Sequence, residues 1–401
     1  MKKGWQTRTI GDVCEFQRGL TYAKGDEVDV SDNVVLRATN IDLATNLLIF
    51  DELKYISDKV RVPESKKVKK GSLMICMASG SKSHLGKVAF IDDDYGYAFG
   101  GFMGMLTPLN GLLPKYLFHL MTSEDYKEFI GALSDGANIN NLTFDKLKLF
   151  PVPVPPLAEQ QRIVGLLDEA FAGLATAKAN AEKNLQNART LFESHLQSVF
   201  TQRGPGWVDR TLDQVCIVER GSSPRPIKEY FTTKPDGVNW IKIGDTEEGG
   251  KYVHTTAQKI TPEGAKQSRF VKEGDFILTN SMSYGRPYIM KTSGYIHDGW
   301  FVLRLNMAID TDYFYYLLSS PVVQSQFASL ASGAVVKNIS GDLVKKAVLP
   351  IPPLEHQHII VEKLLALEEE TQRLARLYER KHAALEALKK SLLHQAFTGA
   401  L

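Results

Sequence analysis

Cysteine is scarce in this chain. The 401 residues include three cysteines, Cys14, Cys76 and Cys216. They form no C-x-x-C pair, and an odd number cannot all be joined in disulfides within one chain. We therefore expect no disulfide framework and no cysteine-based metal site, but buried free thiols in a reducing, cytoplasmic environment.

Long apolar runs and a strong net charge are also missing. No stretch approaches the ~20 apolar residues that cross a bilayer, so we expect no membrane span. The basic residues Lys2 and Lys3 are not followed by the apolar stretch of a secretory signal. The net charge is only +2, which by itself does not suggest a nucleic-acid binder, whose domains are usually strongly basic.

The sequence motifs of common enzymes are absent. The segment from Gly80 to Lys87 resembles a P-loop, but five residues instead of four separate its glycines, and Val88 stands where a Ser or Thr should hold magnesium. There is no H-E-x-x-H and no G-x-S-x-G. His356 and His358 would lie on different faces of a helix, which makes them poor co-ligands. We therefore predict no catalytic residue, no bound cofactor and no metal in this chain.

The chain does contain a tandem repeat. Residues 4–19 read GWQTRTIGDVCEFQRG and residues 206–221 read GWVDRTLDQVCIVERG, with eight of 16 positions identical at a constant offset of 202. Average composition would give about one match by chance. Residues 151–163 (PVPVPPLAEQQRI) and 348–360 (VLPIPPLEHQHII) form a second repeated pair. A period this long indicates duplicated domains and not a solenoid.

The repeat divides the chain into a globular part and a long helix, twice over. We predict a first globular domain over residues 1–152, a first helix over 153–202, a second globular domain over 203–350 and a second helix over 351–401. Short β-rich runs and a helical stretch over 114–133, with counterparts in the second half, indicate α+β domains. The expected fold is therefore two tandem, pseudo-symmetric domains of mixed α/β content, separated by a two-helix antiparallel coiled coil.

The two helices have an apolar seam. After each Pro-Pro-Leu segment, apolar residues recur at spacings of three and four. Each helix of about 40 residues would be ~60 Å long and needs a partner for its apolar stripe. The nearest partner is the other copy in the same chain, and homodimerisation is the alternative. The residues expected to pack the pair are Ile163, Leu167, Leu174, Leu185, Phe192, Ile360, Leu364, Leu367, Leu374 and Leu388.

Basic charge is concentrated locally in the first half. Nine basic residues lie between Lys54 and Lys87, opposed only by Asp58 and Glu64. A polar loop over residues 79–87 follows, with a counterpart over residues 280–286. Cations can neutralise phosphates, and hydroxyls, amides and long cations at loop tips can contact phosphates and base edges. Solvated surface loops are the alternative. The candidate DNA contacts are Arg37, Asn40, Lys66, Lys67, Lys69, Lys70, Ser79, Ser81, Lys82, Ser83 and Lys87 in the first half, and Arg225, Lys228, Lys242, Arg269, Ser281, Ser283, Tyr284 and Arg286 in the second.

Taken together, the paired GW…RT…VC…RG segments, the paired Pro-Pro-Leu…Gln…Ile segments and the closing Gln395-Ala396-Phe397-Thr398-Gly399 resemble the specificity subunits of type I restriction-modification systems. The resemblance covers essentially the whole chain. It implies two target-recognition domains, each reading one half of a bipartite site in double-stranded DNA. The lysine-rich segment over residues 66–87 and the segment over 269–286 then correspond in position to DNA-facing loops.

The same resemblance implies what the chain assembles with. The paired helices would set the spacer between the half-sites and dock two methyltransferase subunits, and motor-nuclease subunits would join for restriction. S-adenosylmethionine, ATP and magnesium are then expected on those partner subunits. The one departure in the helical elements, Ala158 where the second copy has Glu355, puts none of this in doubt.

Two other functions deserve comparison. A nuclease or methyltransferase is disfavoured by the missing motifs. A coiled-coil protein-protein scaffold without DNA readout remains an alternative on the sequence.

Overall fold

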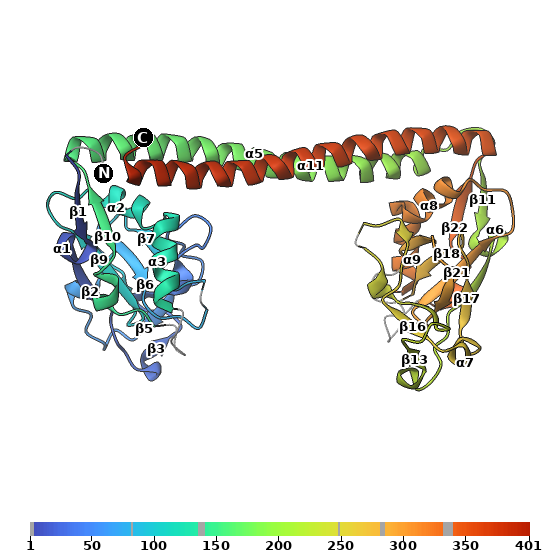
Figure 1. Ribbon diagram of the computed structural model, residues 1–401, viewed down its shortest axis with the longest axis horizontal. Helices are drawn as coiled ribbons and strands as arrows, with labels where there is room; N and C mark the ends of the chain where they lie inside the picture. The colour runs from blue at the N-terminus through green and yellow to red at the C-terminus, as the bar shows by residue number, and fades with distance from the viewer. Residues whose placement is uncertain (1–3, 82, 135–140, 248, 281–284, 332–339) are drawn as a thin grey trace. The chain divides into compact units, whose positions relative to one another are not determined.

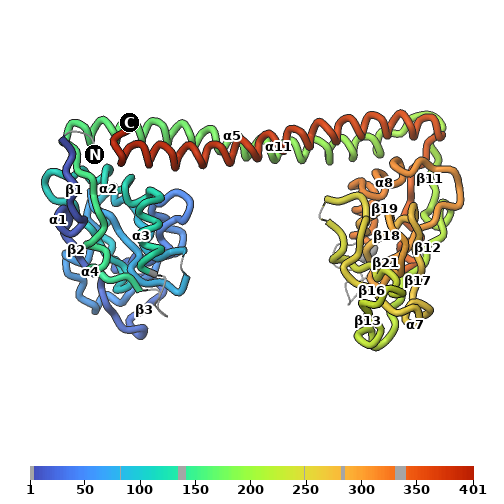
Figure 2. The backbone as a smooth tube through the Cα atoms, viewed as in Figure 1, coloured from blue at the N-terminus to red at the C-terminus, as the bar shows by residue number. Residues whose placement is uncertain are grey.

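The computed structural model describes residues 4–401, apart from residues 82, 135–140, 248, 281–284 and 332–339. The chain divides into two compact units (Figures 1 and 2). Unit 1 contains residues 1–182 and 380–401, and unit 2 contains residues 183–379. Each unit therefore combines a globular part with half of each long helix. The four-part division expected from the sequence stays a prediction.

The two long helices are α5 (Leu157–Thr201) and α11 (Leu354–Thr398). In unit 1, the first part of α5 lies beside the last part of α11 (Figure 2), with Lys178 Nζ 2.8 Å from Glu386 Oε1. In the same unit, Glu182 Oε1 lies 3.4 Å from His382 Nε2. The partner numbers fall as the α5 numbers rise, so the helices are antiparallel. The expected pairing within one chain is confirmed, as is the α+β fold class with two tandem domains.

The globular part of unit 1 contains two main sheets. The first is antiparallel, with the strand order β2-β9-β6-β7, and the second has the order β3-β5-β4-β8. A separate two-stranded ladder joins β1 to β10. The strands are β1 Gln6–Thr9, β2 Cys14–Arg18, β3 Glu27–Val28, β4 Asn33–Leu36, β5 Lys54–Ile56, β6 Leu73–Cys76, β7 Val88–Phe90, β8 Ala98–Phe99, β9 Met103–Pro108 and β10 Pro151–Val154. The helices of the globular part are α1 Ile10–Val13, α2 Pro114–Leu120, α3 Glu124–Ser134 and α4 Phe144–Leu147. The 3-10 turns are η1 Lys24–Asp26, η2 Ala38–Asn40 and η3 Glu64–Lys66.

Unit 2 repeats this plan with five strands in each main sheet, where unit 1 has four. The strand orders in unit 2 are β12-β21-β18-β19-β15 and β13-β16-β14-β20-β17, and β11 pairs with β22. The strands are β11 Val208–Thr211, β12 Cys216–Arg220, β13 Phe231–Thr232, β14 Val238–Ile241, β15 Tyr252–Val253, β16 Gln258–Ile260, β17 Arg269–Val271, β18 Phe276–Thr279, β19 Pro287–Met290, β20 Gly294–Ile296, β21 Trp300–Leu305 and β22 Val348–Ile351. The helices of the globular part are α6 Leu212–Val215, α7 Pro262–Ala265, α8 Thr311–Ser319, α9 Pro321–Ala331 and α10 Gly341–Val344. The 3-10 turns are η4 Ile227–Tyr230 and η5 Ile243–Asp245.

The two kinds of repeated segment are partners in space. In unit 1, the GW…RT segment supplies β1 and the PVPV segment supplies β10, with Thr9 opposite Pro151. In unit 2, β11 pairs with β22 in the same way, with Thr211 opposite Val348. Each ladder brings the first residues of a globular part to its last residues, just before a long helix begins. This pairing explains why the sequence repeats most clearly at both ends of each half.

A buried glutamine anchors each long helix to its globular part. Gln160 is fully buried, and its amide accepts from the Leu113 N–H and donates to the Pro155 carbonyl, at 2.8 and 2.9 Å. Gln357 makes the matching bonds in unit 2, with the Asp310 N–H and the Pro352 carbonyl, at 2.8 and 2.9 Å. A buried amide with all its partners in place fixes the angle at which the helix leaves the ladder. This is the structural role of the repeated Gln in the Pro-Pro-Leu…Gln…Ile element.

The hydrophobic core of each unit extends into both long helices. In unit 1, Phe397 of α11 packs edge-on against Tyr116 of α2, with ring centroids 5.3 Å apart. In unit 2, Phe200 of α5 packs against Tyr313 of α8 in the same manner, at 5.6 Å. Both tyrosine hydroxyls donate to a proline carbonyl of the adjoining ladder. The helices are therefore part of the cores and not only connectors between them.

One helix expected from the sequence is in fact two. The stretch over residues 114–133 forms α2 and α3, and its counterpart forms α8 and α9. The hydroxyl of Ser123 accepts from the Tyr126 N–H at 3.3 Å, and Ser320 accepts from the Val323 N–H at 3.4 Å. These serines act as N-caps and start a new helix in a new direction. The sequence does not reveal the break between the two helices, because the apolar spacing continues across it.

The predicted helix seam is only partly buried. Ile163 and Leu167 bury their side chains in the core of unit 1, and Leu364 does so in unit 2. Leu388 is wrong as a packing residue because 47% of it is exposed, whereas Leu393, on another face of the helix, is buried. The other predicted packing residues are half-buried: Leu174, Leu185, Phe192, Ile360, Leu367 and Leu374.

The three cysteines are buried free thiols, as expected. Burial raises the pKa of Cys14 and Cys216 to about 12 and that of Cys76 to about 11, which keeps them protonated and unreactive. Across the described residues, no group of His, Cys, Asp and Glu side chains is arranged to hold a metal ion. No helix in the described part of the chain is long and apolar enough to cross a membrane.

Candidate nucleic-acid interface

In each unit, several strands end at one place, which we call the strand-end edge. In unit 1, it is formed by the ends of β2, β4 and β6 and by the start of β9. In unit 2, the corresponding strands are β12, β14, β18 and β21. The polar loops that the sequence marked as DNA-contacting follow β6 and β18 directly. The candidate contacts are therefore judged by their position relative to this edge.

A glycine closes the strand-end edge in both units. A Cβ atom on Gly19 would lie 2.0 Å from the carbonyl oxygen of Gly100, and one on Gly221 would lie 2.0 Å from that of His297. No side chain fits at such a distance from a backbone atom. The glycine of the repeated Arg-Gly pair is therefore required by a close backbone approach between two loops. This approach holds the edge in the same shape in both units.

A hollow of about 490 Å³ opens at the strand-end edge of unit 1. Its lining includes Arg37 after β4, Ala78 after β6 and Phe102 before β9. The Nε atom of Arg37 is buried and has no hydrogen-bond partner among the described residues. Phe102 is 74% exposed at this hollow. The structure thus brings the predicted Arg37 and Ala78, the residue just before the Ser79 loop, together around one cavity.

Phe102 was not among the residues predicted from the sequence. An aromatic residue after Gly100-Gly101 and before a strand is a weak signal, and the repeat conceals it because Gly299 occupies the matching place in unit 2. The backbone bonds show the match: the Phe102 carbonyl accepts from the Met77 N–H, and the Gly299 carbonyl accepts from the Asn280 N–H.

Asn40 does not belong to this surface. Its side-chain oxygen accepts from the Arg37 N–H at 2.8 Å, and its amide donates to the carbonyls of Ile49 and Glu52 at 3.0 and 3.3 Å. Only 1% of the residue is exposed. Its side chain is fully used in holding η2, so the expectation that it contacts DNA is corrected to a structural role.

The strand-end edge of unit 2 is filled by a polar network around Asp298. Its carboxylate accepts from the Ser223 hydroxyl at 2.6 Å and lies 3.3 Å from Nη2 of Arg225, and its carbonyl accepts from the Asn280 amide at 2.7 Å. The Ser223 hydroxyl holds the pKa of Asp298 below its usual range. Arg225 extends from this network with 80% of its side chain exposed, so it can reach a ligand outside the protein.

Lys242 occupies in unit 2 the place of Arg37. Its N–H donates to Asp245 at 2.7 Å, just as the Arg37 N–H donates to Asn40. The charge of Lys242 acts on the neighbouring His297, whose pKa is lowered chiefly by burial. The expected correspondence of Arg37 and Lys242 is therefore a structural one, although their surroundings differ.

The polar loop of unit 1 keeps its hydroxyls at the surface. The Ser79 hydroxyl accepts from the Ser81 N–H at 3.1 Å, and the hydroxyls of Ser81 and Ser83 lie 2.7 Å apart. Lys87, at the end of the loop, donates to the Leu43 carbonyl. Burial lowers the pKa of Lys87, and the charge of Lys127 acts in the same direction. Lys82 lies outside the described residues.

The lysine run before β6 does not form one patch. Lys66 donates to the Arg18 carbonyl at 2.8 Å, near the strand-end edge. Lys67 is paired with Glu64 at 2.5 Å, and Lys70 lies 3.6 Å from Asp93. Lys69 and Lys70 precede β6 while the Ser79 loop follows it, so they lie at opposite ends of that strand. We correct the single basic patch to separate, partly paired cations.

The remaining candidates of unit 2 are also dispersed. Arg269 on β17 is paired with Glu219 at 3.0 Å, beside the partly buried Arg304 that the same carboxylate binds, so it is engaged within the fold. Lys228 on η4 is exposed. Ser281, Ser283 and Tyr284 lie outside the described residues.

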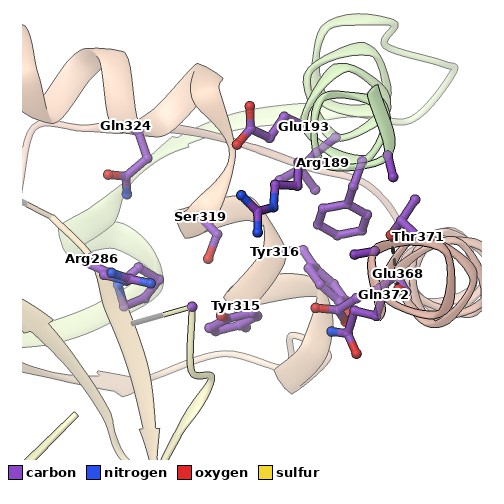
Figure 3. A pocket seen from close by; sticks show the side chains of 16 residues that line it. Arg189, Glu193, Arg286, Tyr315, Tyr316, Ser319, Gln324, Glu368, Thr371 and Gln372 are labelled. Carbon is purple, nitrogen blue, oxygen red and sulfur yellow. Dashed lines mark hydrogen bonds between the residues drawn. The ribbon is translucent and has the colours of Figure 1, made fainter. Parts of the chain in front are cut away.

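Arg286 borders a second hollow, which lies wholly in unit 2. Its guanidinium stands over the ring of Tyr288, 5.7 Å from the centroid. The hollow measures about 690 Å³ and lies where α5, α8 and α11 meet. Figure 3 shows Tyr315 and Arg189 facing the same space from α8 and α5. Tyr316 closes one wall through a hydrogen bond to Glu368.

The family model for the type I restriction modification DNA specificity domain matches residues 2–185 and 205–379. The StySPI specificity subunit of Salmonella potsdam is 26% identical over 100% of this chain and 90% of its own length, and the EcoKI specificity subunit of Escherichia coli K12 is 25% identical over the same shares.

Two solved structures share the fold. One, described as showing complex assembly and conformational transition of the type I R-M system, has a TM-score of 0.83 and 19% identity, covering 100% of this chain and 99% of that chain. The HsdS subunit of Thermoanaerobacter tengcongensis has a TM-score of 0.66 and 19% identity, covering 100% and 98%. Because the family model matches both halves, the chain belongs to the type I restriction modification DNA specificity domain family.

Proposed function

We propose that this chain is the non-catalytic, DNA-reading subunit of a cytoplasmic type I restriction-modification complex. Each unit reads one half of a bipartite site in double-stranded DNA. The observation that carries the proposal is the repeated strand-end edge, which has one backbone shape in both units but different side chains. A common scaffold with unlike readers suits an asymmetric target, because base edges are distinguished by the side chains that face them.

The long helices supply the other half of the proposed function. They are integral to both cores, so they can fix the spacer between the half-sites and offer a surface to two methyltransferase subunits. S-adenosylmethionine would be bound by those subunits, and ATP and magnesium by motor-nuclease subunits that join them. A scaffold without DNA readout is not favoured, since the match to a DNA specificity family extends over both units.

The proposal is tested by exchanging residues 1–154 for the same region of another family member. This boundary keeps β1 and β10 from one parent, so their ladder stays intact. The hybrid is expressed with its methyltransferase subunits, and the methylated positions of the host genome are sequenced. We expect one half-site to change and the other to persist. A change in both half-sites, or in neither, would contradict the modular reading of DNA.

A further inference from the structure

Among the described residues, no acidic side chain forms an ion pair with Arg37 at the strand-end edge of unit 1. Its Nε atom is buried without a partner among the described residues. The acidic residue that lines the same hollow, Glu27, is already paired with Lys54 at 2.5 Å. Desolvating part of a guanidinium without giving it an acceptor is costly. Because Nε itself is closed off, a ligand would meet the terminal nitrogens of the guanidinium, and acceptor atoms placed there would stabilise the cation.

The side chains at the hollow indicate which acceptors fit. A guanidinium is a planar fork that donates two parallel hydrogen bonds, which matches a pair of acceptors in one plane. In the major groove, guanine presents such a pair, O6 and N7. The exposed ring of Phe102 at the same hollow favours contact with a base, because an apolar side chain gains nothing beside a charged phosphate.

The counterpart in unit 2 lacks these features. Lys242 replaces the fork with a single ammonium, and Gly299 stands in place of Phe102. The space is crossed by the hydrogen bonds of Asp298 with Ser223 and Asn280. The arrangement in unit 1 is thus not required by the shared frame, and a recognition role specific to that unit explains it.

We propose that Arg37 reads a guanine in the half-site bound by unit 1, donating to O6 and N7 of that base, with Phe102 packed against the neighbouring base. This inference rests on the proposed function and adds to it a residue and a base.

The test uses the complete complex with its methyltransferase subunits. Methylation rates are measured on duplexes in which each base of each half-site is replaced in turn, for the wild type and for Arg37→Gln. We expect the unit 1 half-site to contain a guanine whose replacement slows the wild type. In Arg37→Gln, discrimination at that position should fall about five-fold to a hundred-fold, the worth of one bidentate pair, with the half-site of unit 2 read as before.

Arg37→Lys separates a base from a phosphate as the ligand. Lysine keeps the charge but not the planar fork, so the guanine preference should weaken in Arg37→Lys if the ligand is a base, whereas a phosphate contact would persist and leave the base preference as in the wild type. Arg8→Gln is the matched charge control, since Arg8 lies on the exposed β1 and donates to Gln6; its base preferences should equal those of the wild type. Unchanged reading of the unit 2 half-site shows that each variant folds and assembles.

Three results would overturn the inference while leaving the proposed function intact. They are a unit 1 half-site without guanine, a uniform slowing by Arg37→Gln with unchanged base preference, and full retention of guanine preference by Arg37→Lys. Failure of the proposed function looks different: the hybrid with exchanged residues 1–154 would then change both half-sites or neither.

Discussion

Unit 1 and unit 2 are alike in their frame and unlike at their strand-end edges. In both, a tyrosine of the helix after the central sheet donates to a proline carbonyl of the closing ladder, Tyr116 to Pro153 and Tyr313 to Pro350. At the edge, unit 1 has a hollow with Arg37, whereas unit 2 has the network around Asp298. The repeated residues hold the fold, and the residues that differ face the place where DNA would be read.

The junction with the long helices shows a second difference. In unit 1, the buried His119 lies 2.8 Å from Asp168 of α5 and packs edge-on against Phe171. In unit 2, Tyr316 takes the corresponding place on α8 and bonds to Glu368 of α11, beside the hollow in Figure 3. The same corner of the fold is therefore closed by a titratable pair in one unit and left partly open in the other.

The largest expected effect comes from changing the helices that the two units share. Inserting seven residues after Asn187 and seven after Lys381 adds about 10 Å to each helix while nearly keeping its rotational phase. If each unit reads its own half-site, the preferred spacer should lengthen by about three base pairs. Methylation of the original target should fall on the order of a thousand-fold, because one half-site is lost. Methylated-site sequencing of cells that carry the variant measures both.

A five-residue insertion at the same positions is the control for phase. It rotates the following part of the helix by more than a third of a turn, so no spacer length should restore full methylation. If the seven-residue insertion left the preferred spacer unchanged, the helices would not set its length. The view that each unit reads its own half-site would then be contradicted too.

The next effect concerns the shared frame. Phe200→Ala and Phe397→Ala should each destabilise the unit in which the ring is buried by about 3–5 kcal/mol, through lost burial and the cavity left behind. Urea denaturation measures the change in the free energy of unfolding, and hydrogen exchange shows in which unit the change occurs. The control is Leu388→Ala, which should cost no more than about 0.5 kcal/mol because Leu388 is 47% exposed. If Leu388→Ala and Phe397→Ala lost comparable free energy of unfolding, the orientation of α11 that buries Phe397 and exposes Leu388 would be wrong.

The smallest effect sharpens the difference between the helix junctions. Burial lowers the pKa of His119, although the hydrogen bond and charge of Asp168 oppose this. The unfolded chain then binds the proton first, so the contribution to stability is complete above about pH 6.5 and declines as the pH falls below it. His119→Gln should flatten this acid-side decline in hydrogen exchange of α2. The exposed His356→Gln should leave it unchanged, and an undiminished decline in His119→Gln would exclude His119 as its source.

The sequence alone was sufficient for the features that depend on local patterns and on the repeat. Periodic apolar spacing gave the two long helices, and the matched segments gave two tandem domains of one fold. The absence of enzyme motifs and the residues of the repeat indicated the family. These signals persist because they recur at fixed intervals along the chain and need no knowledge of distant contacts.

Only the tertiary structure decided which residues face outward at each edge. It paired β1 with β10, buried Asn40 at the end of η2 and exposed both Leu388 and Phe102. It also gave the lysines of the run separate, distant partners, the Arg18 carbonyl for Lys66 and Asp93 for Lys70. Each of these outcomes depends on contacts between residues far apart in the chain, and the sequence pattern carries no record of which distant backbone or side chain a residue meets.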